Sequence, residues 1–184
     1  SERQSNLDSR WPTLVTKMAD FDNVTDTACI SMYSGGKPAT MEEVMLAGTN
    51  LMSAFPQTVT KPWVAQMARL AQRIGITKER INDSVDNLIL HHRYPTLTIA
   101  DVLDFDIRLK LYSYREVRRM DGKFDDETLA DYPLYVRTED GRCFYVRMAE
   151  VMELPDRFRQ HVLNVIEGLK KKLSAERGRA AEGA

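Results

Sequence analysis

The chain has 184 residues, of which 43% are hydrophobic and 29% are charged, and its net charge is −1. These values exclude a disordered or fibrous chain, and also a protein that attracts nucleic acid through its overall charge. No apolar run approaches the roughly 20 residues that a membrane span requires. The two cysteines, Cys29 and Cys143, are far apart in the sequence, which indicates a reducing compartment and predicts a cytoplasmic location.

Residues 1–38 are predicted to form an N-terminal extension that docks only in part. Within it, the sequence "DTACISMY" is rich in residues that favour strands, and it predicts one. The sequence "SGGKPAT" follows, in which Gly35 and Gly36 cost entropy when they are ordered and Pro38 cannot continue a helix. We therefore expect a break in the regular structure before residue 39.

Residues 39–174 are predicted to form one mainly helical domain. Thr40 and Glu43 have the spacing of a capping box, in which two side chains satisfy unpaired backbone N–H groups at a helix start. Further helices are expected to begin at Pro62, Thr77, Thr98, Ser113 and Asp156. Apolar residues at helical spacing form one stripe on each of the first three helices, and the stripe of the third is expected to face inward. These residues are Met41, Val44, Met45, Ala47, Gly48, Leu51, Met52 and Phe55 of the first, Trp63, Met67, Leu70, Ala71 and Ile74 of the second, and Ile81, Val85, Leu88 and Ile89 of the third.

The sequence "PLYVRTEDGRCFYVR" predicts a β-hairpin. Apolar and polar residues alternate over Leu134–Arg137 and Cys143–Arg147, around an Asp140–Gly141 turn. Because an isolated hairpin is marginal in water, we expect it to pack on the helices or to pair with strands from the N-terminal region. Residues 175–184, at the end of the last helix, are expected to fray. The predicted fold class is therefore α+β, a mainly helical bundle with a small antiparallel hairpin near 134–147.

The residues that could support catalysis form no recognised pattern. His91 and His92 are adjacent, so they point in different directions on a helix, and no HExxH spacing accompanies them. Carboxylates at helical spacing, such as Asp101 and Asp104, are typical of solvated helix faces. Cys143 has no catalytic signature around it, and we interpret it as a small packed side chain. The sequence thus predicts a protein that is not an enzyme and uses no metal or cofactor.

Basic and aromatic residues are interleaved in two segments, "RLKLYSYREVRRM" and the predicted hairpin. Cations that bind phosphates beside rings that stack on bases are the components of a single-strand-binding surface. The candidate nucleic-acid-binding residues are Tyr114, Arg115, Arg118, Arg119, Arg142 and Arg147. The alternative is a solvated helix face with tyrosines packed in the core. It is favoured by the acidic segment "DDETLAD" between the two basic segments and by the lack of a high overall pI.

Residues from about 60 to 106 carry a pattern of a different kind. A helix with a Trp near its start, "TKPWVAQMARLAQRIG", is followed by a second helix and then by the corner "YPTLTIAD". This order resembles the small helical domain of phage-type helicase loaders and replisome-organiser accessories, with matching positions at Trp63, Tyr94, Pro95, Thr98, Ile99, Ala100 and Asp101. The resemblance implies a partner of a replicative helicase. No ATP-binding loop is present, which excludes a loader of the AAA+ type.

Two functions from different classes follow from these observations. The first is a non-catalytic DNA-replication accessory of the phage or mobile-element type, which binds a replicative helicase and single-stranded DNA. The second is a structural or regulatory interaction module that binds no nucleic acid and forms a homodimer. Its contact surface would be the methionine-rich first helix, with Met41, Met45 and Met52. In both cases we expect a protein partner and no membrane.

Overall fold

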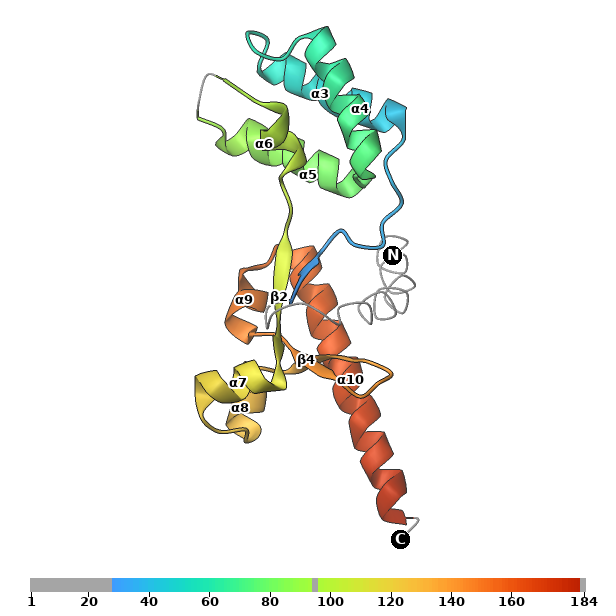
Figure 1. Cartoon of the computed structure of the whole chain (residues 1–184), viewed down its shortest axis with the longest axis vertical. Helices are drawn as coiled ribbons and strands as arrows, with labels where there is room; N and C mark the ends of the chain where they lie inside the picture. Colours follow the sequence, from blue (N-terminus) through green and yellow to red (C-terminus); the bar gives the residue numbers. More distant parts are fainter. Residues whose placement is uncertain (1–27, 94–95, 183–184) are drawn as a thin grey trace. The chain divides into compact units, whose positions relative to one another are not determined.

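The computed structural model describes residues 28–93 and 96–182 of the chain (Figure 1). Contacts divide the chain into two compact units. Among the described residues, unit 1 combines 28–34 with 108–182, and unit 2 contains 35–93 and 96–107. The division predicted from the sequence was an extension over 1–38 and one domain over 39–174. The observed division falls after Ser34 and Ile107 because each unit packs around hydrophobic residues of its own.

The described part of unit 2 consists of helices. They are α3 (Met41–Ala54), α4 (Lys61–Ile74), α5 (Lys78–His91) and α6 (Ile99–Leu103). The predicted capping box of α3 is confirmed, since Thr40 Oγ1 accepts from the Glu43 N–H at 3.2 Å and the Glu43 carboxylate accepts from the Thr40 N–H at 2.9 Å. Thr60 is the N-cap of α4, so this helix begins one residue before the predicted Pro62. Gly75, at φ 64°, ends α4 in the left-handed region.

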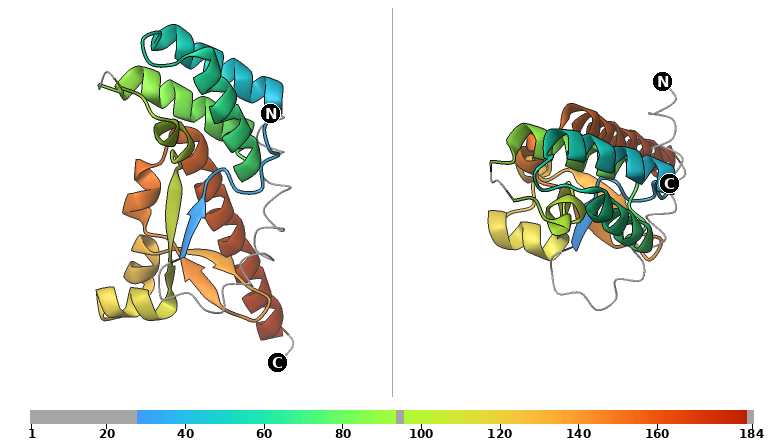
Figure 2. Two further views of the ribbon diagram at one scale, coloured as in Figure 1. Left: turned by 45° about the horizontal axis from the view of Figure 1, so that its top comes forward. Right: turned by 90° about the horizontal axis from the view of Figure 1, so that it is seen from above.

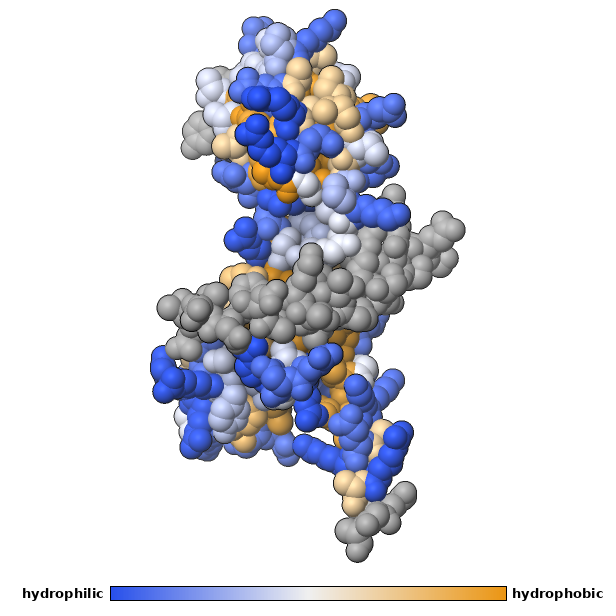
Figure 3. All heavy atoms as spheres, turned by 45° about the vertical axis from the view of Figure 1, so that its right-hand side comes forward, coloured by the Kyte–Doolittle hydropathy of each residue, from blue (hydrophilic) through white to orange (hydrophobic). Residues whose placement is uncertain are grey.

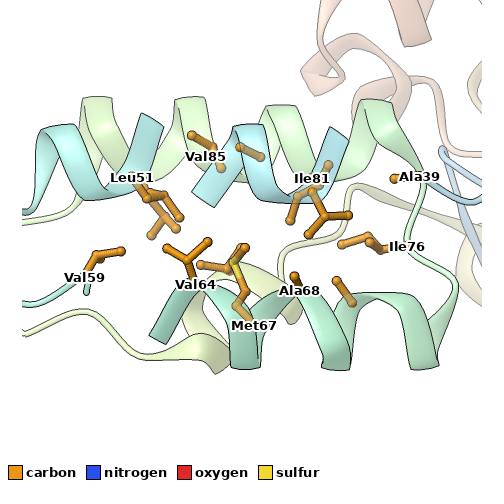
Figure 4. Close-up of a cluster of buried hydrophobic side chains, with 14 of the residues drawn as sticks. Ala39, Leu51, Val59, Val64, Met67, Ala68, Ile76, Ile81 and Val85 are labelled. Carbon is orange, nitrogen blue, oxygen red and sulfur yellow. The ribbon is translucent and has the colours of Figure 1, made fainter. Parts of the chain in front are cut away.

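The core of unit 2 lies between α3, α4 and α5 (Figure 4). Leu51, Ile81 and Val85 point from α3 and α5 toward α4, and they are at most 2% exposed. Val64 and Met67 meet them from α4. Four residues of the predicted apolar stripes are exposed: Met41, Met45, Ile74 and Ile89. In a bundle this small each helix is covered on one side only, so the buried face is narrower than the apolar stripe of the sequence.

Two side chains of α5 fix the short helix α6. Arg80 donates from Nε to the Phe105 carbonyl oxygen at 2.6 Å and from Nη2 to the Leu103 carbonyl oxygen at 2.8 Å. The buried Ser84 hydroxyl donates to the Val102 carbonyl oxygen at 2.7 Å. The last carbonyl groups of a helix have no partner within it. These bonds therefore satisfy the end of α6 and bind it to α5.

Unit 1 is built on an antiparallel sheet with the strand order β1-β2-β4-β3. The strands are β1 (Ala28–Ser31), β2 (Arg108–Ser113), β3 (Leu134–Arg137) and β4 (Cys143–Tyr145). Ala28 pairs with Leu111 and Ser31 pairs with Arg108, so unit 2 is inserted between two neighbouring strands. The predicted hairpin is confirmed as β3 and β4, and it joins β1 through β2. Strand β2 was not among the predicted strands, although Arg108–Leu111 alternates between polar and apolar residues.

Four helices of the described chain complete unit 1. They are α7 (Tyr114–Asp121), α8 (Asp126–Asp131), α9 (Met148–Glu153) and α10 (Asp156–Glu182). Helix α10 lies alongside β3 (Figures 1 and 2). It begins at Asp156 as predicted and continues to Glu182, because the alanine, glutamate and arginine residues near its end favour a helix. The fraying of 175–184 stays a prediction, and residues 183 and 184 lie outside the described residues. Strand β4 ends at Tyr145, before the predicted Arg147, because Arg147 is already the N-cap of α9.

Gly48 of α3 sets the distance between α3 and α4. A Cβ atom at this position would lie 2.4 Å from Val64 Cγ1, which is shorter than a normal contact. The substitution Gly48→Ala is therefore expected to lower the free energy of unfolding by about 1–3 kcal/mol, because the buried, branched Val64 has little freedom to move aside. The measurement is urea unfolding followed by circular dichroism.

Gly168 of α10 provides the matched control. No atom lies within 4 Å of a Cβ atom built there. The substitution Gly168→Ala is expected to stabilise unit 1 by about 0.5–1 kcal/mol, because alanine loses less backbone entropy in a helix. If Gly48→Ala were as stable as the wild type, α3 and α4 could not be packed as closely as they are in this structure.

Candidate nucleic-acid interface

Three of the predicted arginines lie on one face of α7. A capping box fixes the start of this helix: Ser113 Oγ accepts from the Glu116 N–H at 3.3 Å, and the Glu116 carboxylate accepts from the Ser113 N–H at 2.8 Å. The fully buried Val117 sets which side faces the core. Residues three and four positions apart share a helix face. The exposed face opposite Val117 is therefore an arginine face, formed by Arg115, Arg118 and Arg119.

The arginine face has no carboxylate partner within the described part of the chain. None of its guanidinium groups forms an ion pair or a hydrogen bond there. The two carboxylates of α7 serve other partners. Glu116 closes the capping box, and Asp121 accepts a hydrogen bond from the Thr128 hydroxyl group. The face therefore presents three positive charges to solvent, where an anionic ligand can bind them.

An exposed tyrosine adjoins the arginine face. Tyr114 is 45% exposed, and it precedes Arg118 by four residues, so the two side chains are neighbours on the helix surface. The centroid of its ring lies 4.6 Å from that of Phe124. The Phe124 centroid in turn lies 5.4 Å from that of Tyr145. A row of rings thus runs from the arginine face to strand β4.

The two predicted arginines of the hairpin lie outside the arginine face. Arg142 is in the hairpin turn, where its Nε lies 2.7 Å from the Asp140 carboxylate. The hydrogen bond from Thr138 and the nearby Arg142 hold the pKa of Asp140 below its usual range, so this pair is charged at neutral pH. Arg147 is exposed beyond the other end of β4. The structure therefore brings Tyr114 together with three of the five predicted arginines on α7, and the other two belong to the hairpin turn and the start of α9.

A hollow of about 400 Å³ opens in unit 1 beside the row of rings. Its lining is mainly apolar, with two cations from α10, and no carboxylate is among the lining residues. This hollow is the α8–α10 groove, and its main residues are Phe124, Leu129, Leu134, Lys170, Leu173 and Arg177. Phe124 and Tyr145 belong both to the groove and to the row of rings, so the row of rings connects the groove with the arginine face.

The candidate acid–base residues of unit 2 are engaged in structural contacts. The centroid of the His92 ring lies 5.7 Å from that of Phe55, and His92 Nε2 is 3.1 Å from the Thr96 carbonyl oxygen. Hydrogen bonds from Thr98 lower the pKa of Asp101, which closes the capping box of α6.

Among the residues that the structure describes, no three His, Cys, Asp or Glu side chains gather as a metal-ligand set. None of the described helices is long and apolar enough to cross a membrane.

Comparison of the chain with protein-family models, curated proteins and solved structures found no match. The site is therefore defined by its own geometry. The sequence analysis did not single out Phe124, and it did not connect Lys170 or Arg177 with α7. The signal for Phe124 was weak, since it is a single aromatic residue between a basic and an acidic segment. Lys170 and Arg177 join it only because α10 packs along the hairpin.

The buried phenol groups of unit 1 predict a loss of stability at alkaline pH. Burial raises the pKa of Tyr145 to about 12, above the value of about 10 in an unfolded chain. A group whose pKa is raised by folding contributes stability below the unfolded value, and this stability is lost as the pH rises toward the folded value. Unit 1 is therefore expected to unfold at lower urea concentrations as the pH rises from about 10 to about 12.

The substitution Tyr145→Phe removes the phenol and keeps the ring. Its urea midpoint should fall less than that of the wild type between neutral and strongly alkaline pH, because phenylalanine cannot ionise. The urea midpoint of the variant should still fall to some extent, because burial also raises the pKa of Tyr112 and Tyr135. An equal fall in the two proteins would mean that folding does not protect the Tyr145 phenol.

Proposed function

We propose that this chain is a non-catalytic accessory protein of DNA replication, of the phage or mobile-element type, which binds single-stranded DNA and a replicative helicase. The observation that carries the proposal is the arginine face of α7. Arg115, Arg118 and Arg119 are exposed on one side of a capped helix, with no carboxylate bound to them in the described chain. Three adjacent, unneutralised guanidinium groups supply the positive charge that a phosphate backbone attracts.

Single strands are favoured over duplex DNA by the adjoining tyrosine. Tyr114 is 45% exposed and borders Arg118 on the helix surface. The bases of a single strand are free to stack on such a ring, whereas those of a duplex are stacked on each other. Arg118 and Arg119 also lie in the last turn of α7, where the helix dipole favours positive charge. The helix can therefore hold the arginine face without an internal counter-charge.

The helicase part of the proposal rests on the resemblance of residues 60–106 to phage-type helicase loaders and replisome organisers. This segment falls entirely within unit 2, Gly35–Ile107, and so belongs to one compact helical body. Unit 2 also exposes large apolar side chains on α3, namely Met41, Met45 and Leu46. Exposed apolar residues that cluster on one helix are typical of a protein-binding surface. We therefore propose unit 2 for the helicase and unit 1 for the DNA.

Binding to end-labelled single-stranded oligonucleotides, followed by fluorescence anisotropy over a salt series, tests the DNA part. The triple substitution of Arg115, Arg118 and Arg119 by Gln should weaken binding at least roughly tenfold at low salt, because three phosphate contacts are lost. The slope of log affinity against log salt should become shallower by about 2, since each contact with a single strand contributes about 0.7.

A matched control removes three positive charges from unit 2. Lys61, Arg69 and Arg73 are exposed on α4, and their substitution by Gln should leave the affinity and the salt slope nearly unchanged. Equal effects of the two triple substitutions would mean that charge alone, and not the arginine face, governs binding. If the wild type does not bind the oligonucleotide at low salt, the proposed binding of single-stranded DNA is wrong.

A homodimeric interaction module without nucleic-acid binding is the second candidate, and the apolar surface of α3 favours it. Met45 and Leu46 are 38% and 64% exposed, and a two-fold contact would bury them against a second copy. Light scattering over a concentration series should then show a mass that rises from 21.1 kDa toward twice that value. Substitution of both residues by Lys should abolish the rise, and substitution of the exposed α4 residues Ala65 and Gln66 by Lys should not. A constant monomer mass excludes this candidate.

A further inference from the structure

We infer that the α8–α10 groove of unit 1 binds a base of single-stranded DNA, and that the cations of α10 bind the neighbouring phosphates. The inference rests on the proposed function and deepens it. It extends the DNA site from the arginine face of α7 to a second helix, and it assigns a role to Phe124, Lys170 and Arg177, three residues that the arginine face does not include.

The groove continues the arginine face through contacts between rings. Tyr114 borders Arg118 on α7, and its ring centroid is 4.6 Å from that of Phe124. Phe124 is half-buried, packs on the cluster around Val117 and Tyr145, and lines the groove. A strand whose phosphates lie on the arginine face can therefore place one base on Tyr114 and the next on Phe124, since base stacking on aromatic rings does not depend on sequence.

The charges of the groove come from one wall. Lys170 and Arg177 are seven residues apart on α10, with Ser174 between them at helical spacing, so they share one helix face. The C-terminal part of α10 carries mostly hydrophilic side chains on the face that Figure 3 shows. Glu176 is paired with Arg137 at 3.6 Å, whereas Glu167 precedes Lys170 by three residues and shares its helix face. With two cations and one carboxylate, the Lys170–Arg177 face keeps a net positive charge.

The opposite wall of the groove, helix α8, determines on which side the phosphates of the DNA lie. Helix α8 exposes the carboxylates of Asp126, Glu127 and Asp131, which repel phosphates. The phosphates must therefore follow α10, and the base must point into the apolar space between the two helices. Leu129, Leu134 and Leu173 line this space, and Phe124 offers a ring face there. A nucleotide base flanked by two phosphates complements this groove, because its flat ring can pack between the apolar side chains while the phosphates meet the cations of α10.

An acidic peptide with a large apolar side chain has a related chemistry, and two observations favour DNA over it. The groove is continuous with three exposed arginines, which a polyanion fills and a single acidic side chain does not. The connection between the two parts is also a pair of aromatic rings, Tyr114 and Phe124, and rings are the side chains on which successive bases stack.

The test uses the full chain and a short oligonucleotide with one 2-aminopurine base, whose fluorescence falls when it stacks. End-label anisotropy reports binding, and the 2-aminopurine signal reports stacking. Phe124→Leu keeps the apolar packing but removes the ring, and it should weaken binding about tenfold and reduce the quenching of 2-aminopurine. The double substitution Lys170→Gln and Arg177→Gln should make the salt slope shallower by roughly 1.4, which corresponds to two phosphate contacts. Urea midpoints verify that each variant is folded.

The control is the double substitution Lys171→Gln and Arg179→Gln, which removes the same charge from exposed positions of α10 that do not line the groove. It should change the affinity less than about twofold.

If the arginine-face variant weakens binding while Phe124→Leu and the Lys170/Arg177 variant do not, the groove inference is overturned and the proposed function stands. If the wild type does not bind the oligonucleotide, both fail. If the groove variants lose only binding to a synthetic glutamate- and leucine-rich peptide, the groove is a peptide site and the inference is wrong.

Discussion

Pairing on both edges of strand β2 is the constraint on which unit 1 depends. Ala28–Ser31 pairs with one edge, and Tyr112 and Ser113 pair with Tyr145 and Phe144 on the other. Both ladders join segments that are far apart in the sequence, so closing them costs chain entropy that local preferences cannot repay. The buried side chains of the sheet, such as Leu109 and Leu111, supply the hydrophobic free energy that offsets this cost. Without β2, the N-terminal strand and the hairpin would have no common partner.

The orientation of the candidate interface follows directly from this strand. Ser113 is the last residue of β2, pairs with Phe144, and is also the N-cap of α7. The helix therefore starts at a position that the sheet fixes, and the burial of Val117 fixes its rotation. The hydroxyl group of Tyr112 donates to the Glu150 carboxylate and ties the same strand to α9. A binding surface placed on such rigid elements keeps its geometry when the ligand is absent.

The insertion of unit 2 between β1 and β2 separates two kinds of surface. Unit 1 holds the arginine face and the α8–α10 groove, and unit 2 holds the exposed apolar side chains of α3. Unit 2 has its own core and its own internal ties, such as the bonds from Arg80 to the end of α6. Each surface can therefore change by substitution without a loss of folding in the other unit, which makes the proposed division between DNA and protein partner accessible to experiment.

Local signals in the sequence determined the helix starts, the hairpin and the arginine face. Thr40, Thr98 and Ser113 act as caps because a capping box needs only residues three positions apart, and Asp140–Gly141 sets the turn for a similar reason. The tertiary structure alone decided the two units, strand β2 and the groove. These depend on residues that no short pattern links: Ser31 pairs with Arg108, and Phe124 and Arg177 line the same groove. Burial of apolar surface selects those contacts over the whole chain, and it also left Met41 and Met45 exposed although the helical period placed them on the same stripe as Leu51.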